Sequence, residues 1–319
     1  MVTQLPDISV VMSVYNGAEG LAETVDSILT QQGVTLEFII IDDGSTDGSG
    51  DILDAYATRD PRVRVHHQAN QGLTRALATG CAMARGRYIA RQDAGDVSLA
   101  DRLVRLINLL DGDRDVVMVT CGTAFVGPEG EQLYTVQQNS LELQNGLNEL
   151  DFAKVRGPSH HGSTMFRRDM YNAAGGYRPA FRVAQDIDLW TRLVERGPCL
   201  AIPDVLYQAK WAPGSISATK RPEQIRTLKT ILECAAARRG GGEEAKVLRR
   251  WSQEQDRAPA RDRVWRSRSS EDARFYYFIG NILRKTEAAR SRHYYVEAIR
   301  CRPLYARAWA GLVRQMISR

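Results

Sequence analysis

Carboxylate side chains stand at three places in this chain where they could do chemistry. Asp42 and Asp43 follow an apolar run in the stretch IIIDDGSTDGS. Asp93 and Asp96 begin and end the sequence Asp-Ala-Gly-Asp, and Asp186 stands within QDIDLW. Carboxylates accept protons and hydrogen bonds, and they coordinate divalent cations. These acids are therefore candidate site residues, and the elements that hold them decide their chemistry.

The run that precedes Asp42 and Asp43 is typical of a buried strand in a parallel sheet, because it is continuously apolar and ends in turn residues. In open α/β sheets, ligands bind in the crevice outside the carboxyl ends of the strands. Two charges at such a strand end do not serve stability, but they lie where a nucleotide would bind. The stretch therefore predicts an enzyme that holds a nucleotide.

Strand-like and helix-like patterns alternate from Ile8 to about Gly122, which predicts right-handed βαβ crossovers and a mostly parallel sheet. Strands are expected at Ile8–Val14, Phe38–Asp42, Val63–His67, Tyr88–Arg91, Val116–Thr120, Ser163–Phe166 and Val205–Lys210. Helices are expected at Leu21–Leu29, about Leu73 to Ala84, Leu103–Leu110 and Ile187–Arg196. A Gly-Pro-Glu-Gly turn at Gly127–Gly130 predicts a hairpin.

Beyond Pro222 the pattern is helical almost to the end of the sequence. The spacing of aromatic and small residues between Tyr276 and Met316 suggests two helical hairpins of the tetratricopeptide kind. We therefore expect a catalytic domain over residues 1–220 and a helical extension over 221–319, with apolar positions that could serve self-association or acceptor delivery.

The composition is that of an ordinary globular protein, with 25% charged residues and a formal net charge of +5. A basic excess between Arg238 and Arg268 could attract phosphate, an anionic membrane or nucleic acid, although a solvated helical face is the simpler interpretation. Five scattered cysteines favour reduced thiols in the cytoplasm. Neither a signal peptide nor an apolar run of bilayer length is apparent, so any membrane contact must be peripheral.

Four segments, taken together and in order, closely resemble the family 2 glycosyltransferases. They are VVMSVYNGAEGLAETVDSILTQ from Val10, IIIDDGSTDGS from Ile39, NQGLTRALATGCAMARGRYIARQDAGD from Asn70 and QDIDLWTRL from Gln185. The resemblance covers roughly Ile8 to Ser217. It implies a GT-A fold, which is an α/β fold with a Rossmann-like, mostly parallel sheet flanked by helices. It also implies an inverting reaction that uses a nucleotide-sugar donor.

In that family, the segment that matches Ser13, Val14 and Tyr15 cradles the nucleobase together with the second carboxylate of the DD pair. The resemblance thus implies that Asp43 accepts an N–H of the base and that Tyr15 offers a ring for stacking, which would suit uracil or thymine. The residue types alone also allow Tyr15 to be a rim aromatic and Asp42 to cap the following turn.

Asp93 and Asp96 match the metal-binding motif of the family, which most often reads DADD. The resemblance implies that they bind Mn²⁺ or Mg²⁺, which would neutralise the leaving diphosphate, and that Asp93 also contacts the nucleotide sugar. Two departures weaken this metal site. Gly95 replaces the usual third Asp, and Trp211-Ala212 stands where the family commonly has a His before its Pro-Gly-Ser segment.

Asp186 matches the catalytic base of the family, which takes the proton of the acceptor hydroxyl. Because Gln185 replaces the more usual Glu, the base has no charged neighbour in sequence, and we expect its pKa to be held lower. Helix capping is a compatible second role for Asp186. His161, in the segment SHHGSTMFRR, is a candidate for substrate contact, with a structural role as the alternative.

The expected reaction moves a sugar from a UDP- or dTDP-linked donor to a hydroxyl of a glycan or lipid-linked acceptor, in bacterial surface polysaccharide synthesis. Nucleic acid is not expected as a partner. A nucleotidyltransferase would need basic residues in the loop NGAEG, which has none. The remaining alternative is a degenerate GT-A domain that acts as a scaffold, and it is opposed by the intact acids Asp43, Asp93, Asp96 and Asp186.

Overall fold

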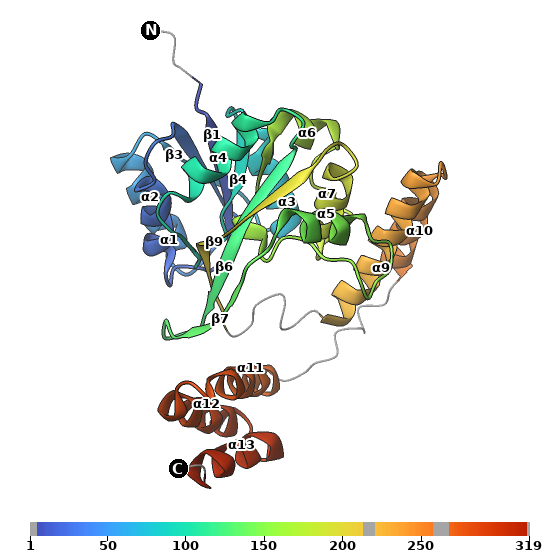
Figure 1. Ribbon diagram of the computed structural model, residues 1–319. Coiled ribbons are helices and arrows are strands. Elements are labelled where there is room, and N and C mark those ends of the chain that lie inside the picture. Colours follow the sequence, from blue (N-terminus) through green and yellow to red (C-terminus); the bar gives the residue numbers. More distant parts are fainter. Residues whose placement is uncertain (1–4, 213–220, 258–267, 318–319) are drawn as a thin grey trace. The chain divides into compact units, whose positions relative to one another are not determined.

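The computed structural model describes residues 5–212, 221–257 and 268–317 (Figure 1). Contacts between residues divide the chain into two compact units. Unit 1 comprises Met1–Ala124, Thr135–Ala209 and Gln224–Ser252, and unit 2 comprises Phe125–Tyr134, Lys210–Glu223 and Gln253–Arg319. Among the described residues, no helix combines the length and apolarity that a bilayer crossing requires.

Strands and helices alternate through the first part of the chain, as the sequence predicts. The strands are β1 (Ile8–Val14), β2 (Leu36–Asp42), β3 (Val63–His67), β4 (Tyr88–Arg91), β5 (Val97–Ser98), β6 (Met118–Val126), β7 (Gln132–Val136), β8 (Met165–Arg167) and β9 (Cys199–Lys210). The helices between them are α1 (Leu21–Leu29), α2 (Ser49–Arg59), α3 (Leu73–Ala82), α4 (Arg102–Gly112), α5 (Ser140–Asn148), the 3₁₀ turn η1 (His161–Ser163), α6 (Arg168–Ala173) and α7 (Gln185–Leu193).

The described strands form one sheet in the order β3-β2-β1-β4-β8-β6-β9-β5, and β7 pairs with β6 in the expected hairpin. The strands β3, β2, β1 and β4 are parallel, with Val14 opposite Asp42. β8 runs antiparallel to both β4 and β6, and β5 runs antiparallel to β9. The α/β fold class is therefore confirmed, and the sheet combines a parallel half with an antiparallel half.

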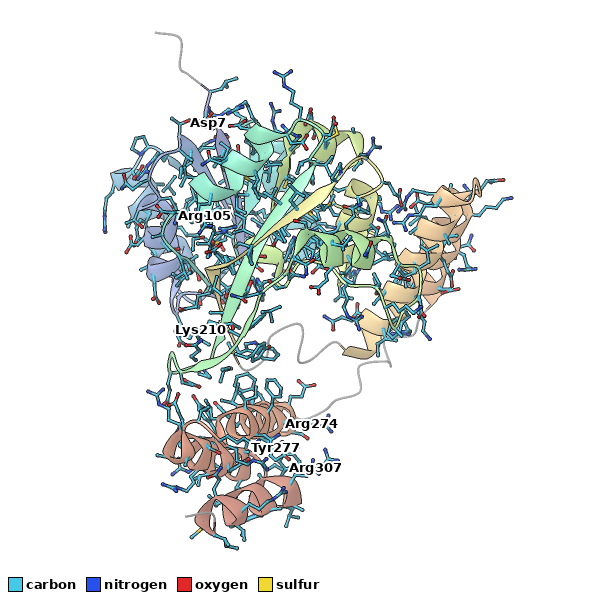
Figure 2. The ribbon with its side chains drawn as sticks, viewed as in Figure 1. Asp7, Arg105, Lys210, Arg274, Tyr277 and Arg307 are labelled. Atoms are coloured by element: carbon cyan, nitrogen blue, oxygen red, sulfur yellow. The ribbon has the colours of Figure 1, made fainter. Side chains whose placement is uncertain are left out.

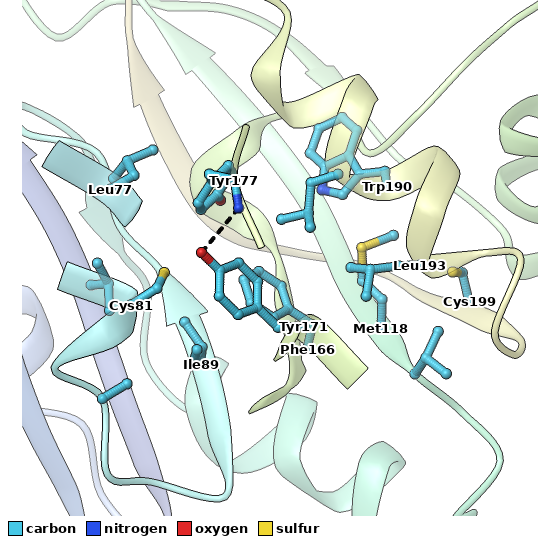
Figure 3. Close-up of a cluster of buried hydrophobic side chains, with 14 of the residues drawn as sticks. Leu77, Cys81, Ile89, Met118, Phe166, Tyr171, Tyr177, Trp190, Leu193 and Cys199 are labelled. Atoms are coloured by element: carbon cyan, nitrogen blue, oxygen red, sulfur yellow. Dashed lines mark hydrogen bonds between the residues drawn. The ribbon is translucent and has the colours of Figure 1, made fainter. Parts of the chain in front are cut away.

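Every residue of β2 is buried, which means that both faces of the sheet are covered at this strand. On one face, Ile39 and Ile41 belong to a cluster with Leu77 of α3 and Trp190 of α7 (Figure 3). Tyr171 lies in the same cluster, and its hydroxyl accepts a hydrogen bond from the backbone N–H of Tyr177. This packing accounts for the continuous apolar run in β2, and it makes Trp190 a core residue.

Helices α9 (Arg221–Arg239) and α10 (Glu244–Arg257) follow β9. Trp251 of α10 packs on Phe181 and donates its indole N–H to the carbonyl of Ala180 at 2.9 Å. Unit 1 therefore includes most of α9 and α10, whereas the sequence pattern groups them with the extension. The functional division at residue 220 stays a prediction.

Unit 2 contains α11 (Arg268–Leu283), α12 (Ala288–Cys301) and α13 (Ala306–Ile317). Phe275, Ile279 and Leu283 of α11 form a buried cluster with Tyr294 of α12. Trp211 packs against this cluster within unit 2. Three successive helices joined by short links are compatible with the predicted tetratricopeptide pattern, which stays a prediction.

Glu37 is a buried carboxylate near the start of β2, at the edge opposite the strand ends that carry the candidate site. It accepts hydrogen bonds from the Ser9 hydroxyl at 2.7 Å and the Arg85 backbone N–H at 2.8 Å, and it pairs with Arg64 at 2.6 Å. Burial by itself would raise the pKa of Glu37, but these donors outweigh it and lower the pKa.

We expect Glu37→Ala to lower the free energy of unfolding by about 1–3 kcal/mol, because it leaves buried donors without their acceptor. Urea unfolding would measure the loss, and Glu23→Ala, at an exposed position of α1, is the control with little effect. Since the folded-state pKa is depressed, the contribution of Glu37 should be present above the unfolded pKa and disappear as pH falls through the folded pKa. An equal loss of stability for both variants would contradict this assignment.

Candidate active site

The candidate site lies where the parallel strands end. β1, β2 and β4 run in the same direction, so the loops after Val14, Asp42 and Arg91 leave the sheet at one edge. These loops carry the segments that the sequence analysis selected. The position agrees with the rule that ligands of open α/β sheets bind outside the carboxyl ends of the strands.

The loop after β1 is tied to the loop after β2. Asn16, in a left-handed conformation with φ 50°, accepts a hydrogen bond from the backbone N–H of Thr46 at 2.8 Å. In return, the Ser45 hydroxyl accepts from the Asn16 N–H at 3.0 Å, and the Asp47 carboxylate accepts from the Ala18 N–H at 3.0 Å. Tyr15 projects from this braced loop with 57% of its surface exposed, so its ring is accessible for stacking.

The two adjacent acids have different partners. Asp42 accepts the backbone N–H of Ser45 at 3.0 Å and contacts His67 Nδ1 at 2.8 Å, so it does cap the turn. Asp43 is buried and accepts the backbone N–H groups of Gln71 at 2.9 Å and Gly72 at 2.8 Å, as well as the amide of Gln68. Asp43 therefore braces this loop. A carboxylate has about four acceptor sites, and the donors from the described part of the chain use three of them.

The Asp-Ala-Gly-Asp segment is a tight turn. The backbone N–H of Asp96 donates to the carbonyl of Asp93 at 3.2 Å, and Gly95 has φ 91°. A side chain is strained at such a positive φ, and glycine adopts it freely. The turn therefore gives a physical reason for Gly95 where the family usually has Asp.

Asp93 and Asp96 are joined by His160, which the sequence analysis did not select. One ligand atom from each of the three side chains lies within 4.8 Å of the other two. His160 Nδ1 is 3.8 Å from Asp93 Oδ2 and 3.5 Å from Asp96 Oδ2. Two carboxylate oxygens and an imidazole nitrogen suit a divalent cation such as Mn²⁺, so the residues present fit the expected metal.

Tyr207 on β9 supports this cluster from below. Its hydroxyl donates to Asp96 Oδ2 at 2.9 Å and accepts the backbone N–H of Asp93 at 3.1 Å, and its ring stacks on His160. Arg102, fully buried, lies over the Tyr207 ring and donates to the carbonyl of Gly162 at 2.5 Å. These contacts orient all three candidate ligands, as second-shell hydrogen bonds do in metal sites.

Asp93 also pairs with Arg91, whose side chain is fully buried, at 2.6 Å. Burial alone would raise the pKa of Asp93, but the charge of Arg91 outweighs it and lowers the pKa. Asp93 is therefore held ionised, which is the state that a metal ligand requires.

Asp186 lies in the first turn of α7, where it accepts the backbone N–H of Ile187 at 2.9 Å. Burial raises the pKa of this half-buried carboxyl, and the charge of Asp93 raises it further. The expectation that the pKa of Asp186 is held low next to Gln185 is therefore wrong, because burial and a residue distant in sequence determine this pKa. The electrostatic interactions with Asp93 and His160 put Asp186 near the acidic cluster.

His161 faces the protein interior. Its Nε2 is 2.7 Å from the Tyr177 hydroxyl, and its ring meets Trp190 edge-on. Burial lowers the pKa of His161 to about 3, with a further contribution from Arg91, so the imidazole is neutral. Little of its surface is available to a substrate, and its role in substrate contact stays a prediction.

A family model for glycosyl transferase family 2 matches residues 9–174, which is more than half of the chain. The chain belongs to glycosyl transferase family 2. The matched region contains Asp43, Asp93, Asp96 and both histidines of the site, and it ends before Asp186. The resemblance read from the four sequence segments is thus confirmed.

Curated relatives agree with this family 2 membership. The chain is 33% identical over 196 residues to the putative glycosyltransferase EpsE of Bacillus subtilis, covering 60% of this chain and 68% of that protein. It is 30% identical over 234 residues to the succinoglycan biosynthesis protein ExoO of Rhizobium meliloti, covering 70% of this chain and 66% of that protein. Some other relatives are longer, and the chain spans as little as 24% of one of them.

The fold of this family 2 member also resembles a solved structure. Residues 1–349 of S. aureus TarS, in complex with UDP-GlcNAc, align over 97% of this chain and 88% of that one, with a TM-score of 0.59 and 15% identity. Together with the family match, this likeness confirms the GT-A fold.

In this family 2 member, three side chains of the candidate site had not been selected from the sequence, namely His160, Tyr207 and Arg102. The pair His160–His161 drew attention, but the pattern favoured the second histidine. A histidine placed before a short turn can face either way, and the sequence carries no sign of which one meets the acids. Tyr207 and Arg102 had no local signal, because each acts through residues distant in sequence.

Proposed function

We propose that this protein is an inverting hexosyltransferase that moves a sugar from a UDP- or dTDP-linked donor to a hydroxyl of a glycan or lipid-linked acceptor. The observation that carries the proposal is the half-buried carboxylate of Asp186, whose pKa responds to the charges of Asp93 and His160, two members of the possible metal-binding group Asp93, Asp96 and His160. An inverting transfer needs one base near the acceptor and a positive site near the leaving diphosphate.

In this mechanism, Asp186 takes the proton of the acceptor hydroxyl, and the oxygen of that hydroxyl attacks the anomeric carbon of the donor sugar. The bond from that carbon to the diphosphate breaks in the same displacement, so the configuration inverts. Asp93, Asp96 and His160 would hold a divalent cation, which supplies positive charge to the departing diphosphate. Tyr207 keeps Asp96 and the Asp93 backbone in place, and Arg91 keeps Asp93 ionised.

For the nucleotide, we propose that Ser13, Val14 and Tyr15 form one wall and that Asp43 forms the other. The exposed ring of Tyr15 would stack on the base, and the remaining acceptor site of Asp43 would receive an imide N–H. Support for a uridine nucleotide also comes from TarS, which was crystallised with UDP and with UDP-GlcNAc. The name of ExoO, a succinoglycan biosynthesis protein, supports a setting in polysaccharide synthesis.

A thermal-shift screen of nucleotide sugars tests the donor class. A UDP- or dTDP-sugar at about a hundred times its Kd should stabilise the protein by about 2.7 kcal/mol, which raises the melting temperature by several degrees. GDP- and ADP-sugars are the controls with little shift. Equal shifts for purine and pyrimidine donors would contradict the assignment of Asp43.

Product analysis then tests the reaction. Slow release of free UDP from the stabilising donor would distinguish an enzyme from a binding scaffold. With an accepted acceptor, proton NMR should show an inverted anomeric configuration in the first-formed product. A product that retains the donor configuration would show that Asp186 does not act as the base of a single displacement.

A further inference from the structure

Helix α13 and the turn that precedes it present large apolar side chains to solvent. We name this set the α13 face, and its members, with their exposed fractions, are Leu304 (91%), Trp309 (48%), Val313 (48%), Met316 (67%) and Ile317 (76%). Single exposed apolar residues are ordinary on a protein surface, but these five gather within fourteen positions of the chain.

The helix period places this face on one side of α13. Trp309, Val313 and Met316 recur at intervals of four and three, so they share one face of the helix. The opposite side, which holds Ala308, Gly311 and Gln315, is buried. A Cβ added to Gly311 would lie 2.6 Å from the ring of Tyr295 on α12, which shows how closely the two helices approach. The α13 face therefore points away from the helix packing of unit 2.

Basic residues accompany the α13 face. Residues 298–317 contain four arginines and no acidic residue. Arg307, labelled in Figure 2, and Arg314 are exposed on α13 itself. At 100° per residue, both fall on one flank of the apolar stripe. Long arginine side chains can lie along an apolar surface while their charge reaches toward anionic groups.

Trp309 is prepared for an apolar environment. Its indole N–H donates to the carbonyl of Pro303 at 2.8 Å, so the one polar group of the side chain already has a protein partner. A tryptophan whose N–H is satisfied can enter lipid without leaving an unpaired donor. Tryptophan is also enriched where proteins meet the membrane–water interface.

We propose that the α13 face docks on an anionic lipid surface. The apolar stripe would enter the interface, and Arg307 and Arg314 would contact lipid phosphates. A second copy of the chain is a poorer fit, because α13 has no acidic residue to meet the arginines of its counterpart. This inference goes beyond the proposed function and does not depend on it, since docking needs neither donor nor acceptor.

Co-sedimentation of the full-length protein with vesicles tests the proposal. Vesicles with about a third phosphatidylglycerol should bind the protein at least ten-fold more tightly than vesicles of phosphatidylcholine alone, and added salt should weaken the binding. Equal binding to both vesicle types, or none to either, would overturn the proposal.

Variants of exposed residues locate the docking surface. Met316→Ser/Ile317→Ser should weaken binding on the order of ten-fold, and Arg307→Glu should do so by a similar factor on anionic vesicles. The matched controls are Leu141→Ser, at a position that is 70% exposed on α5, and Arg59→Glu on α2, which should bind like the unmodified chain.

Unchanged binding of the double-serine variant, with circular dichroism showing an intact fold, would also overturn the lipid proposal. Sedimentation velocity without lipid measures the oligomeric state, which gives one further result that would contradict the lipid proposal. If the unmodified chain were a dimer and the double-serine variant a monomer, the α13 face would be an interface between copies.

Discussion

Replacing Asp186 with Asn should lower the rate of sugar transfer by about a hundred- to ten-thousand-fold, which is the usual effect of removing a general base. Asn has nearly the same size as Asp, and its carbonyl oxygen can still accept the Ile187 N–H that Asp186 accepts at 2.9 Å. Helix α7 should therefore persist. Since Asn cannot take the acceptor proton, the loss should appear in kcat and leave donor affinity nearly unchanged.

Asp169→Asn is the matched control for this variant. Asp169 lies in the first turn of α6 and accepts the Met170 N–H at 2.8 Å, the same local contact that Asp186 makes. It is exposed, and α6 begins at the opposite edge of the sheet, where Arg168 donates to the Arg87 carbonyl. If Asp186→Asn turned over its acceptor as fast as Asp169→Asn does, Asp186 would be a structural residue and the base would lie elsewhere.

The pH profile gives a second readout of Asp186. Burial, the largest effect, raises its pKa, and the backbone N–H groups lower it. The charge of Asp93 raises it further in the metal-free site, and a bound cation would offset that contribution. A protonated carboxyl cannot accept a proton, so kcat should decline as pH falls through the raised pKa, at a pH above that of an ordinary Asp. An acid limb in the ordinary Asp range or below would contradict this expectation.

Removing divalent cations is expected to weaken UDP binding by ten-fold or more, because the acidic cluster would otherwise face the diphosphate with no positive charge between them. Calorimetric titration of UDP with Mn²⁺ and with EDTA measures the difference. Asp96→Asn and His160→Gln should each reduce the Mn²⁺-dependent part of the affinity. Equal affinities in Mn²⁺ and EDTA for the unmodified protein would exclude a metal role in nucleotide binding.

The support of the cluster can be tested separately from its ligands. Tyr207→Phe removes the hydroxyl that donates a hydrogen bond to Asp96 at 2.9 Å, but it keeps the ring that contacts His160 and Arg102. The affinity for Mn²⁺ should therefore fall by about 10- to 100-fold. Tyr88→Phe is the control, since it breaks a hydroxyl–carboxylate bond to Asp111 at the opposite edge of the sheet. Binding of UDP in EDTA should be the same for both variants.

The elements of the parallel half were largely predictable, because their signals are local. The bounds of β1, β3 and β4 agree with the sequence pattern to the residue, since each strand is a short run that ends at turn residues. Helix α2 and helix α5 were not predicted. Each of these helices buries few apolar side chains, namely Leu53 in α2 and Leu143 and Leu147 in α5, so the apolar periodicity that identifies a helix is weak in both.

The acids of the candidate site were also predictable, because parallel strands end at the same edge of a sheet and the residues that follow each strand therefore lie at that edge. Asp43 and Asp93 stand directly after β2 and β4, so one strand assignment places both at the same edge. The family resemblance then predicts their roles, together with that of Asp186, and these roles stay predictions.

What the sequence alone determined is therefore the family, the fold class and the acidic residues of the site, all of which depend on short segments and their order. The tertiary structure alone decided which histidine joins those acids, because His160 and His161 are adjacent in sequence and point to different surroundings. It also decided the pKa of Asp186, which depends on burial and on Asp93, a residue far away along the chain. Burial and long-range charge are properties of packing, and no local pattern encodes them.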